Sequence, residues 1–338
     1  MLGAGSWGTA LAAHLADNDC RVALWGRPED GIDLIRVNRE NQKYLPGVKL
    51  PGGVYPETDI RLASDGIDLL IISVPSQALR EVLQSVQDYI PVKARIVNTA
   101  KGLEMASGRR MSQVAEEVLG SQCMSRFAVM SGPSHAEEVS RQIPTAVTVA
   151  AYNKETAYYI QDTFMSPSFR VYTNPDVAGV ELGGALKNII ALATGMIYGL
   201  GYGDNTAAAL LTRGLTEMIR MGVAMGGDVR TFSGLSGIGD LVVTCGSQHS
   251  RNRRAGELIG QGYSLEQALQ KIGMVVEGVH AIRIVHQLAT EMSIDMPITK
   301  TCYQVLYEGQ NLRAGVEELM QRSKKHEMEE IASPNIDW

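Results

Sequence analysis

Short apolar runs rich in β-branched residues alternate with helical patterns through the first half of the chain, and this alternation limits the possible folds most strongly. The runs that predict buried strands cover residues 21–25, 68–73, 95–99, 127–131 and 146–150. Between two of these runs, residues 78–86 carry apolar side chains at helical spacing. Alternation of this kind builds a parallel sheet with crossover helices. We therefore expect an α/β domain whose helices cover the sheet.

A glycine pattern at the start of the chain is typical of dinucleotide-binding folds. Gly3, Gly5 and Gly8 match G-x-G-x-x-G, and a helical segment follows them at once. In this motif the glycines allow a tight turn and close approach of a pyrophosphate, and the helix N-terminus supplies N–H donors. The pattern predicts a Rossmann-like domain that binds NAD or NADP.

Arg27 follows the strand predicted at residues 21–25, where an NAD-selective fold usually has an acidic residue. An arginine at this position can pair with a 2′-phosphate, which favours NADPH slightly over NADH. The alternative is that Arg27 is a solvated loop residue, so the sequence leaves the preference open.

Only Met1 and Leu2 precede the glycine motif, although a β-strand should lie there. That strand would occupy the centre of the sheet, where its loss removes hydrogen bonds on both sides. Such a loss would open the core and weaken cofactor binding. We expect either a truncated start, which is the favoured interpretation, or a fold that is compromised at the cofactor site.

Strand patterns largely end at a turn cluster over residues 173–176, and helical patterns then continue to about Glu330. The helical segments predicted here cover residues 177–198, 207–225 and 251–260, with others that start near 264, 279 and 298. Capping boxes predict helix starts at Ser264 in this half and at Ser134 in the first half. We expect a dinucleotide-binding domain over residues 1–174 and an all-helical substrate and catalytic domain over residues 175–338.

The charge and composition of the chain exclude several classes of protein. A formal charge of −6 argues against a nucleic-acid binder, and no apolar run of the chain is long enough to cross a bilayer. The 4 cysteines are far apart and lack histidine partners, so neither disulfides nor a metal site is predicted. We expect a cytoplasmic protein that acts on a small molecule.

Lys187 lies in a helical segment, and the helical turn directly before it contains two glycines, which have no side chains. Its neighbours three and four residues back are Gly184 and Gly183, which would let a small ligand approach the amine closely. The alternative is that the glycines serve close helix packing and that Lys187 lies in solvent.

Two further clusters indicate an anionic substrate. Asp240 and Thr244 share one helix face at i, i+4. Ser250, Arg251 and Asn252 open another helix, and guanidinium and amide donors at a helix N-terminus suit a phosphate or carboxylate. A solvated basic face is the alternative for the second cluster. None of the 6 histidines has a persuasive partner, and His135 reads as structural or exposed.

Several motifs occur in order along nearly the whole chain. They are GAGSWG at residues 3–8, VPS at 74–76, KGLE at 101–104, SGPS at 131–134, LGGALKN at 182–188, GDLVVTC at 239–245, SRNRR at 250–254 and VVEG at 275–278. Together they resemble the bacterial NAD(P)-dependent glycerol-3-phosphate dehydrogenases. The resemblance implies reversible reduction of dihydroxyacetone phosphate to sn-glycerol 3-phosphate, a role in phospholipid synthesis, and a homodimer.

The resemblance also implies roles for individual residues. It implies Lys187 as the acid/base, with Asp240 as the catalytic residue that orients it. The implied substrate contacts are Lys101, Gly132, Ser134, Lys187, Asp240, Ser250, Arg251 and Asn252, to which the helix face of Asp240 adds Thr244. The implied cofactor contacts are Ser6, Trp7, Arg27, Lys101, Ala136, Arg251, Val275 and Glu277, beside Gly3, Gly5 and Gly8 of the motif.

Reduction of a ketone needs a hydride on carbon and a proton on oxygen. A lysine ammonium with a near-normal pKa is charged at neutral pH and can donate that proton. The main alternative is a β-hydroxyacid or 6-phosphogluconate type dehydrogenase, which also joins a Rossmann domain to a helical domain. A catalytically weak dinucleotide sensor is a further alternative, because the first strand is nearly absent.

Overall fold

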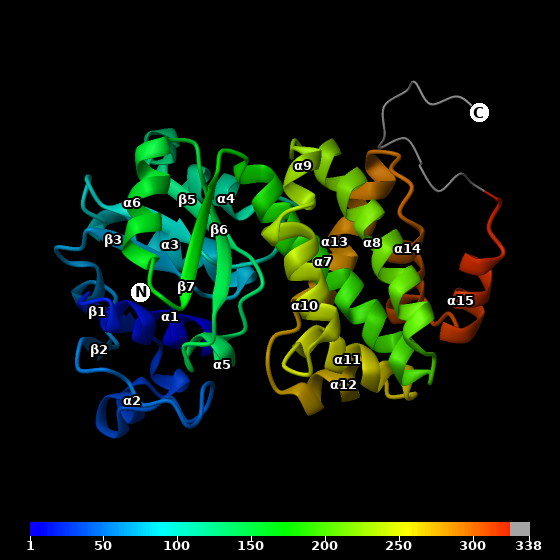
Figure 1. Cartoon of the computed structure of the whole chain (residues 1–338), viewed down its shortest axis with the longest axis horizontal. Coiled ribbons are helices and arrows are strands. Elements are labelled where there is room, and N and C mark those ends of the chain that lie inside the picture. Colours follow the sequence, from blue (N-terminus) through cyan, green and yellow to red (C-terminus); the bar gives the residue numbers. More distant parts are fainter. Residues whose placement is uncertain (325–338) are drawn as a thin grey trace.

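The computed structural model describes residues 1–324, in which a sheet domain lies beside a helical domain (Figure 1). The strands of these residues are β1 (Val22–Trp25), β2 (Val54–Glu57), β3 (Leu69–Ile72), β4 (Arg95–Asn98), β5 (Phe127–Ser131), β6 (Thr145–Ala151) and β7 (Phe169–Asn174). The predicted strands correspond to β1, β3, β4, β5 and β6. The sequence patterns do not predict β2, which is only four residues long and contains Pro56.

The strands lie in the order β2-β1-β3-β4-β5-β6-β7, with Leu2 bridging β1 and β3. Neighbouring strands are parallel except β5 and β6, so the prediction that residues 146–150 continue a parallel sheet is wrong at this pair. A parallel neighbour needs a crossover helix over one face of the sheet. Between β5 and β6 there is only α5 (Ala136–Val139), which is short and packs beside α1 (Ser6–Asp17).

The capping box predicted at Ser134 is also wrong. The N-cap of α5 is His135, and the Ser134 hydroxyl instead donates to the Gly132 carbonyl at 2.9 Å. The hydroxyl is therefore used to shape the turn after β5, not to start the helix.

Met1 to Gly3 fill the central position of the sheet. The Leu2 N–H donates to Ile71 at 2.7 Å and its carbonyl accepts from Ser73 at 2.8 Å, while on the other side the Trp25 N–H donates to the Met1 carbonyl at 2.9 Å. Leu2 is fully buried. The expectation that the core opens here is wrong, because two residues already form the bridges that hold β1 against β3. The effect on cofactor affinity stays a prediction.

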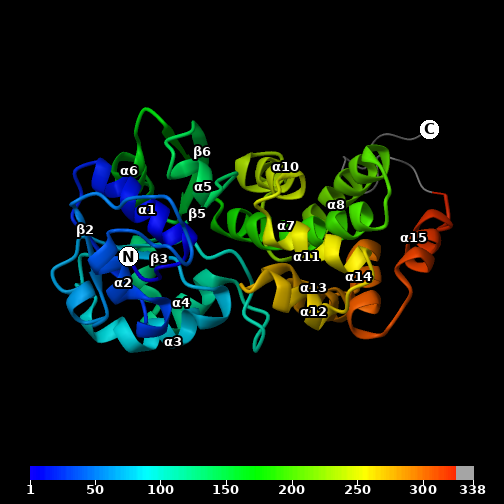
Figure 2. The ribbon, with the colours of Figure 1, turned by 90° about the horizontal axis from the view of Figure 1, so that it is seen from below.

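Successive side chains of a strand point to opposite faces of the sheet, so both faces carry apolar side chains that must be covered. Helices cover both faces here. On one face α1 and α6 (Lys154–Phe164) pack against side chains that include Val97, and on the other α3 (Leu79–Val86) and α4 (Met111–Leu119) pack against the neighbouring Ile96 (Figure 2). A further helix of this domain, α2 (Ile32–Asn38), lies beside β2. The carboxyl ends of the central strands are left facing the helical domain.

The helical domain is built around α7, which runs from Val177 to Gly199. Its other described helices are α8 (Asp204–Ala224), α9 (Val229–Phe232), α10 (Asp240–Gly246), α11 (Arg251–Gly260), α12 (Leu265–Ile272), α13 (Glu277–Glu291), α14 (Pro297–Tyr307) and α15 (Leu312–Met320). The predicted helices correspond to α7, α8 and α11 to α14, and the capping box at Ser264 is confirmed. The helical pattern predicted beyond Lys324 lies outside the described residues.

α7 is long and apolar enough to cross a membrane by length and composition, which the sequence analysis overlooked. Its apolar window is completely buried within the protein, as in the core helix of a globular domain. Glycines allow α11 to approach it closely: a Cβ on Gly195 would lie 2.0 Å from the Arg253 carbonyl, and one on Gly256 would lie 2.0 Å from the Leu192 carbonyl. Glycine faces thus allow the close contact of α11 with α7, while α8, α10 and α13 also pack against α7.

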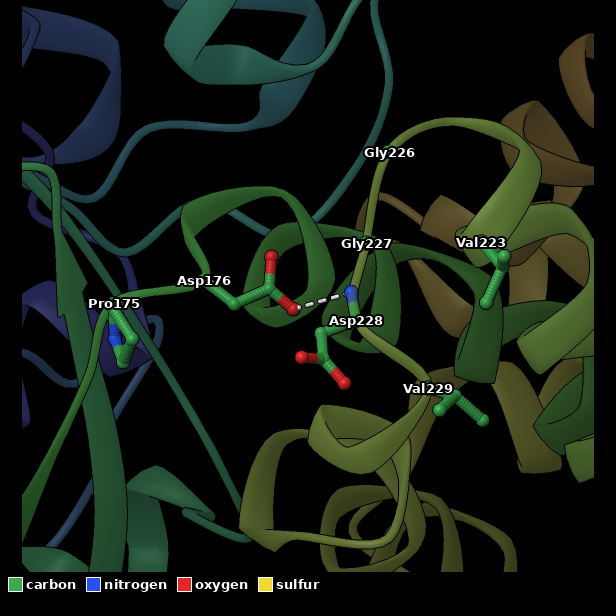
Figure 3. A pocket seen from close by; sticks show the side chains of 7 residues that line it. All are labelled: Pro175, Asp176, Val223, Gly226, Gly227, Asp228 and Val229. Carbon is green, nitrogen blue, oxygen red and sulfur yellow. Dashed lines mark hydrogen bonds between the residues drawn. The ribbon is translucent and has the colours of Figure 1, made fainter.

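A surface hollow of about 410 Å³ lies where the two domains meet (Figure 3). Asp176 lines it, and its carboxylate accepts from Gly179 N at 2.8 Å, Asp228 N at 2.8 Å and Thr231 Oγ1 at 2.7 Å. With both oxygens bound, Asp176 caps α7 and ties it to the loop before α9. These hydrogen bonds of Asp176 therefore stabilise the start of α7.

Candidate active site

Lys187, Asp240 and Thr244 meet where α7 crosses α10. The Lys187 ammonium forms a short hydrogen bond with Asp240 Oδ1 and donates to Thr244 Oγ1 at 2.7 Å. The Thr244 hydroxyl in turn donates to the Asp240 carbonyl at 2.6 Å. The predicted shared face of Asp240 and Thr244 is therefore directed at the lysine. All three residues are buried, with Lys187 only 6% exposed, so the alternative that Lys187 lies in solvent is wrong.

Lys101 reaches this cluster from the sheet domain. It lies on the loop after β4, and its Nζ donates to Asp240 Oδ2 at 2.7 Å and to the Gly132 carbonyl at 3.0 Å. The Lys101 stem packs beside Gly184, where a Cβ would lie 3.4 Å from Lys101 Cγ but only 2.6 Å from Ser131 Oγ, so the close approach that needs glycine is that of Ser131. Gly183 instead packs against the backbone of Ser236. The glycines before Lys187 thus serve close packing of protein groups from both domains.

Burial and charge set the protonation of this cluster. Burial lowers the pKa of Lys187 to about 8, with Asp240 opposing the shift and Lys101 adding to it. The near-normal pKa expected from the sequence is therefore wrong. Burial acts to raise the pKa of Asp240, but Lys101 and Lys187 together hold it below its usual value. Asp240 is thus an anion between two cations, and the pKa of Lys187 is lowered to about 8 beside it.

The glycine turn at the start of the chain fits a dinucleotide. Gly3 has φ +111°, and a Cβ on Gly8 would lie 2.0 Å from the Gly3 carbonyl, so both positions need glycine. Gly5 is the N-cap of α1, and its Cβ position has no atom within 4 Å. The first turn of α1 contains Ser6 and Trp7, and the N–H groups of a first helical turn have no partner within the helix, so the open space at Gly5 fits a bound pyrophosphate.

Arg27 follows β1 on the same edge of the sheet. Its side chain is 60% exposed and pairs with Asp30 at 3.1 Å and with Glu29 at 3.5 Å. This geometry agrees both with a solvated loop residue and with an arginine that binds a 2′-phosphate. The side chain is exposed, and its exposed ion pairs are weak enough to be replaced by a phosphate.

The start of α11 contains the predicted anion-binding residues in three different environments. Ser250 is the N-cap, with Oγ accepting from Arg253 N at 3.2 Å. Asn252 is held by its own domain: its Nδ2 donates to Asn188 Oδ1 at 2.9 Å and its Oδ1 accepts from Gly278 N at 2.8 Å. The Arg251 guanidinium has no hydrogen bond or ion pair with any residue in 1–324.

The remaining predicted cofactor residues lie at the domain junction. Ala136 is buried in the first turn of α5, and Val275 is exposed just before α13. Glu277 begins α13, and its carboxylate accepts from Ser76 N at 3.1 Å and Ser76 Oγ at 2.7 Å. Glu277 therefore binds the sheet domain through both oxygens of its carboxylate.

Residue-by-residue reasoning missed several neighbours of this site. Ser131 Oγ donates to Asp240 Oδ2 at 3.3 Å, Asn188 binds Asn252, and Ser76 binds Glu277. All three stand within motifs that the sequence showed, so the motifs were the available signal. His135 is half-buried beside His249, at a ring separation of 5.8 Å, and its Nε2 is buried without a partner among the described residues.

A glycine-rich dinucleotide turn on a sheet domain, opposed by a buried lysine–aspartate pair on a helical domain, indicates the class of NAD(P)-dependent dehydrogenases. Comparison with known proteins narrows this class. The family model of the NAD-dependent glycerol-3-phosphate dehydrogenase N-terminus matches residues 1–157, and that of the C-terminus matches residues 176–317. The chain belongs to the NAD-dependent glycerol-3-phosphate dehydrogenase family.

Individual relatives agree over the full length of the chain. A glycerol-3-phosphate dehydrogenase (NAD(P)+) of Syntrophomonas wolfei is 62% identical over 100% of this chain and 98% of that protein. The protein of that name from Bacillus subtilis is 51% identical over 98% of this chain and 96% of that protein. The crystal structure of glycerol-3-phosphate dehydrogenase from Coxiella burnetii superimposes with a TM-score of 0.90 at 41% identity, covering 95% of this chain and 98% of that one.

Proposed function

We propose that this protein catalyses the reversible reduction of dihydroxyacetone phosphate by NAD(P)H to sn-glycerol 3-phosphate. The observation that carries the proposal is the setting of Lys187, whose Nζ donates to Asp240 and Thr244 in a buried site. A lysine nitrogen has four substituent positions, and the carbon stem with these two bonds uses three. The fourth is an N–H in the ammonium and a lone pair in the amine. One nitrogen thus serves both directions of the reaction.

In reduction, bound NAD(P)H supplies the hydride to the ketone carbon. The Lys187 ammonium donates its remaining proton to the ketone oxygen, and Asp240 keeps the nitrogen in place and charged until then. Lys101 holds the second oxygen of Asp240, so the aspartate remains an anion while the lysine changes charge. Removal of water from the closed cluster strengthens each of these interactions.

A spectrophotometric assay tests this function directly. Purified protein with dihydroxyacetone phosphate should oxidise NADPH, NADH or both, seen as loss of nicotinamide absorbance. Failure of both cofactors would contradict the proposal. We propose NADPH as the slightly favoured cofactor, because Arg27 is free enough of burial to meet a 2′-phosphate. The ratio of the two rates, compared with that of Arg27→Ala, tests that preference.

The pKa of Lys187 predicts the pH dependence of both directions. Oxidation of glycerol 3-phosphate needs the neutral amine, so its kcat should rise with pH and level off above about 8. Reduction needs the ammonium, so its kcat should fall through the same range. Pre-steady-state rates of hydride transfer across pH 6 to 10, roughly the range that brackets this pKa, measure both limbs. An inflection only near the ordinary lysine value of 10.5 would contradict the assignment.

We propose that Arg251 binds the phosphate of the substrate, since its guanidinium has no partner within residues 1–324 and the next residue on α11, Asn252, binds Asn188 beside Lys187. Arg251→Ala should raise the KM for dihydroxyacetone phosphate by roughly tenfold to hundredfold, the size of a charge-assisted hydrogen bond pair. Steady-state kinetics at saturating NADPH measures the effect. Arg254→Ala, an exposed arginine on the same helix, is the matched control. Equal KM values in both variants would contradict the role.

The other predicted site residues take supporting roles in this proposal. Asn252 and Ser250 order the start of α11 around the phosphate, while Gly132 and Ser134 shape the turn that receives Lys101. We also propose that the protein is a homodimer, lies in the cytoplasm and acts in phospholipid synthesis, which the resemblance supports. The fold supports a further proposal, a domain division between residues 174 and 175. Light scattering of the purified protein tests the dimer.

A further inference from the structure

Ser76 links the two domains through the carboxylate of Glu277. Ser76 follows β3 and is 2% exposed, and its N–H and hydroxyl bind the two oxygens of Glu277 at 3.1 and 2.7 Å. The residues are 201 positions apart in the chain. Both hydrogen bonds are charge-assisted, and together they fix the direction of the carboxylate.

Neighbouring groups hold the Ser76 hydroxyl in this orientation. Gln77 Nε2 donates to Ser76 Oγ at 3.1 Å and to the Leu103 carbonyl at 2.8 Å. Since the Ser76 oxygen accepts from Gln77, its hydrogen is available for Glu277. Gly102 closes over the hydroxyl, and a Cβ there would lie 2.5 Å from Ser76 Oγ. The loop that carries Lys101 therefore packs directly on the Ser76–Glu277 contact.

The backbone of Glu277 is fixed independently of Ser76. The next residue, Gly278, donates its N–H to Asn252 Oδ1 at 2.8 Å, and Asn252 binds Asn188 on α7. The start of α13 is thus anchored to α11 and α7. Ser76 consequently controls the direction of the Glu277 side chain and not the position of the helix.

Glu277 is also the acidic side chain that acts most strongly on Arg251. Burial lowers the pKa of Arg251, and Glu277, followed by Glu137, opposes this shift. The two residues are neighbours in space, because Gly278, next to Glu277, binds Asn252, next to Arg251. Even so, Glu277 makes no ion pair with Arg251, and its two oxygens instead accept from Ser76 N and Ser76 Oγ. A carboxylate released from Ser76 would be drawn to a desolvated guanidinium that has no other partner within residues 1–324.

We propose that Ser76 is a positioning residue for substrate binding: it holds the Glu277 carboxylate away from the Arg251 guanidinium, which therefore stays unpaired for the substrate phosphate. This inference rests on the proposed function of Arg251. In this proposal Ser76 acts through Glu277, which it binds across the two domains, and not through a contact with the substrate.

A double-mutant cycle tests the competition between Glu277 and the substrate. Ser76→Ala leaves the backbone bond but removes the hydroxyl bond, so the KM for dihydroxyacetone phosphate should rise roughly tenfold, the size of one charge-assisted hydrogen bond, with less change in kcat. In a Glu277→Gln background the neutral amide cannot pair strongly with Arg251. There Ser76→Ala should change KM less than about twofold. Ser85→Ala, an exposed serine on α3, is the control.

A second measurement reads the pairing of Arg251 without any substrate. The rate at which phenylglyoxal modifies Arg251, followed by mass spectrometry of its peptide, should fall in Ser76→Ala and recover in the double variant, with Arg254 as the internal reference. An unchanged rate, or an equal KM increase in both backgrounds, would overturn the positioning role. A slower modification with no KM change in Arg251→Ala would instead support the positioning and contradict the phosphate role of Arg251.

Discussion

Lys187→Ala is expected to lower kcat for the reduction of dihydroxyacetone phosphate by roughly 10³-fold, the usual contribution of a positioned general acid. The substitution removes the only nitrogen that Asp240 and Thr244 hold together among the described residues. Affinity for NADPH should change little, because the glycine turn at Gly3 to Gly8 lies on the other domain. Stopped-flow hydride transfer and NADPH fluorescence titration measure the two quantities separately.

Small primary amines sharpen this test. The truncated side chain leaves a space beside Asp240 and Thr244 in which ethylammonium can bind, so added ethylamine should restore part of the lost rate. Rescue should follow the concentration of the protonated amine in reduction and of the free amine in oxidation. Lys300→Ala, an exposed lysine on α14, should have normal activity and show no rescue. Loss of activity without rescue and with an altered melting temperature would indicate a structural role.

The sheet shows where sequence patterns succeed and where they fail. Strands such as β3 and β5 consist almost entirely of apolar residues, so the sequence pattern predicts them without knowledge of their neighbours. Met1 to Gly3 occupy a central position of the sheet with Leu2 as the bridging residue, and a segment this short has no periodicity to detect. The direction of β6 depends on whether α5 covers a face of the sheet, which is a property of packing and not of the strand.

In the site, too, sequence patterns predict local features, while contacts between distant residues depend on the fold. Helical spacing alone puts Asp240 and Thr244 on one face, but their contact with Lys187 spans 53 residues, and only the family resemblance indicated it. The pKa of Lys187 could not be predicted, because it depends on burial and on Lys101 from the other domain. The Ser76–Glu277 contact likewise joins residues with no shared local pattern.

Asp240→Asn should have the second large effect, since this aspartate is the counter-ion of two lysines. Its oxygens bind Lys187 and Lys101, and the residue is 1% exposed. Removal of one partner of a buried pair costs about 3–5 kcal/mol, because the other charge is left without compensation. Urea unfolding at neutral pH should show a loss of this order. Asp33→Asn, in an exposed pair with Arg36, should cost less than about 1 kcal/mol.

The same substitution should move the pH dependence of catalysis. Asp240 now opposes the effect of burial on Lys187, so its loss should take the pKa of that lysine below the present value of about 8. The fall of the reduction rate with pH would then begin at a lower pH, while oxidation would reach its plateau earlier. If Asp240 had only a structural role, Asp240→Asn would lower the stability but leave the inflections of both pH profiles unchanged. An unchanged pH profile would therefore indicate that Asp240 has a packing role and does not control the Lys187 proton. If the profile shifts, the change in pKa measures how strongly the Asp240 carboxylate stabilises the protonated lysine.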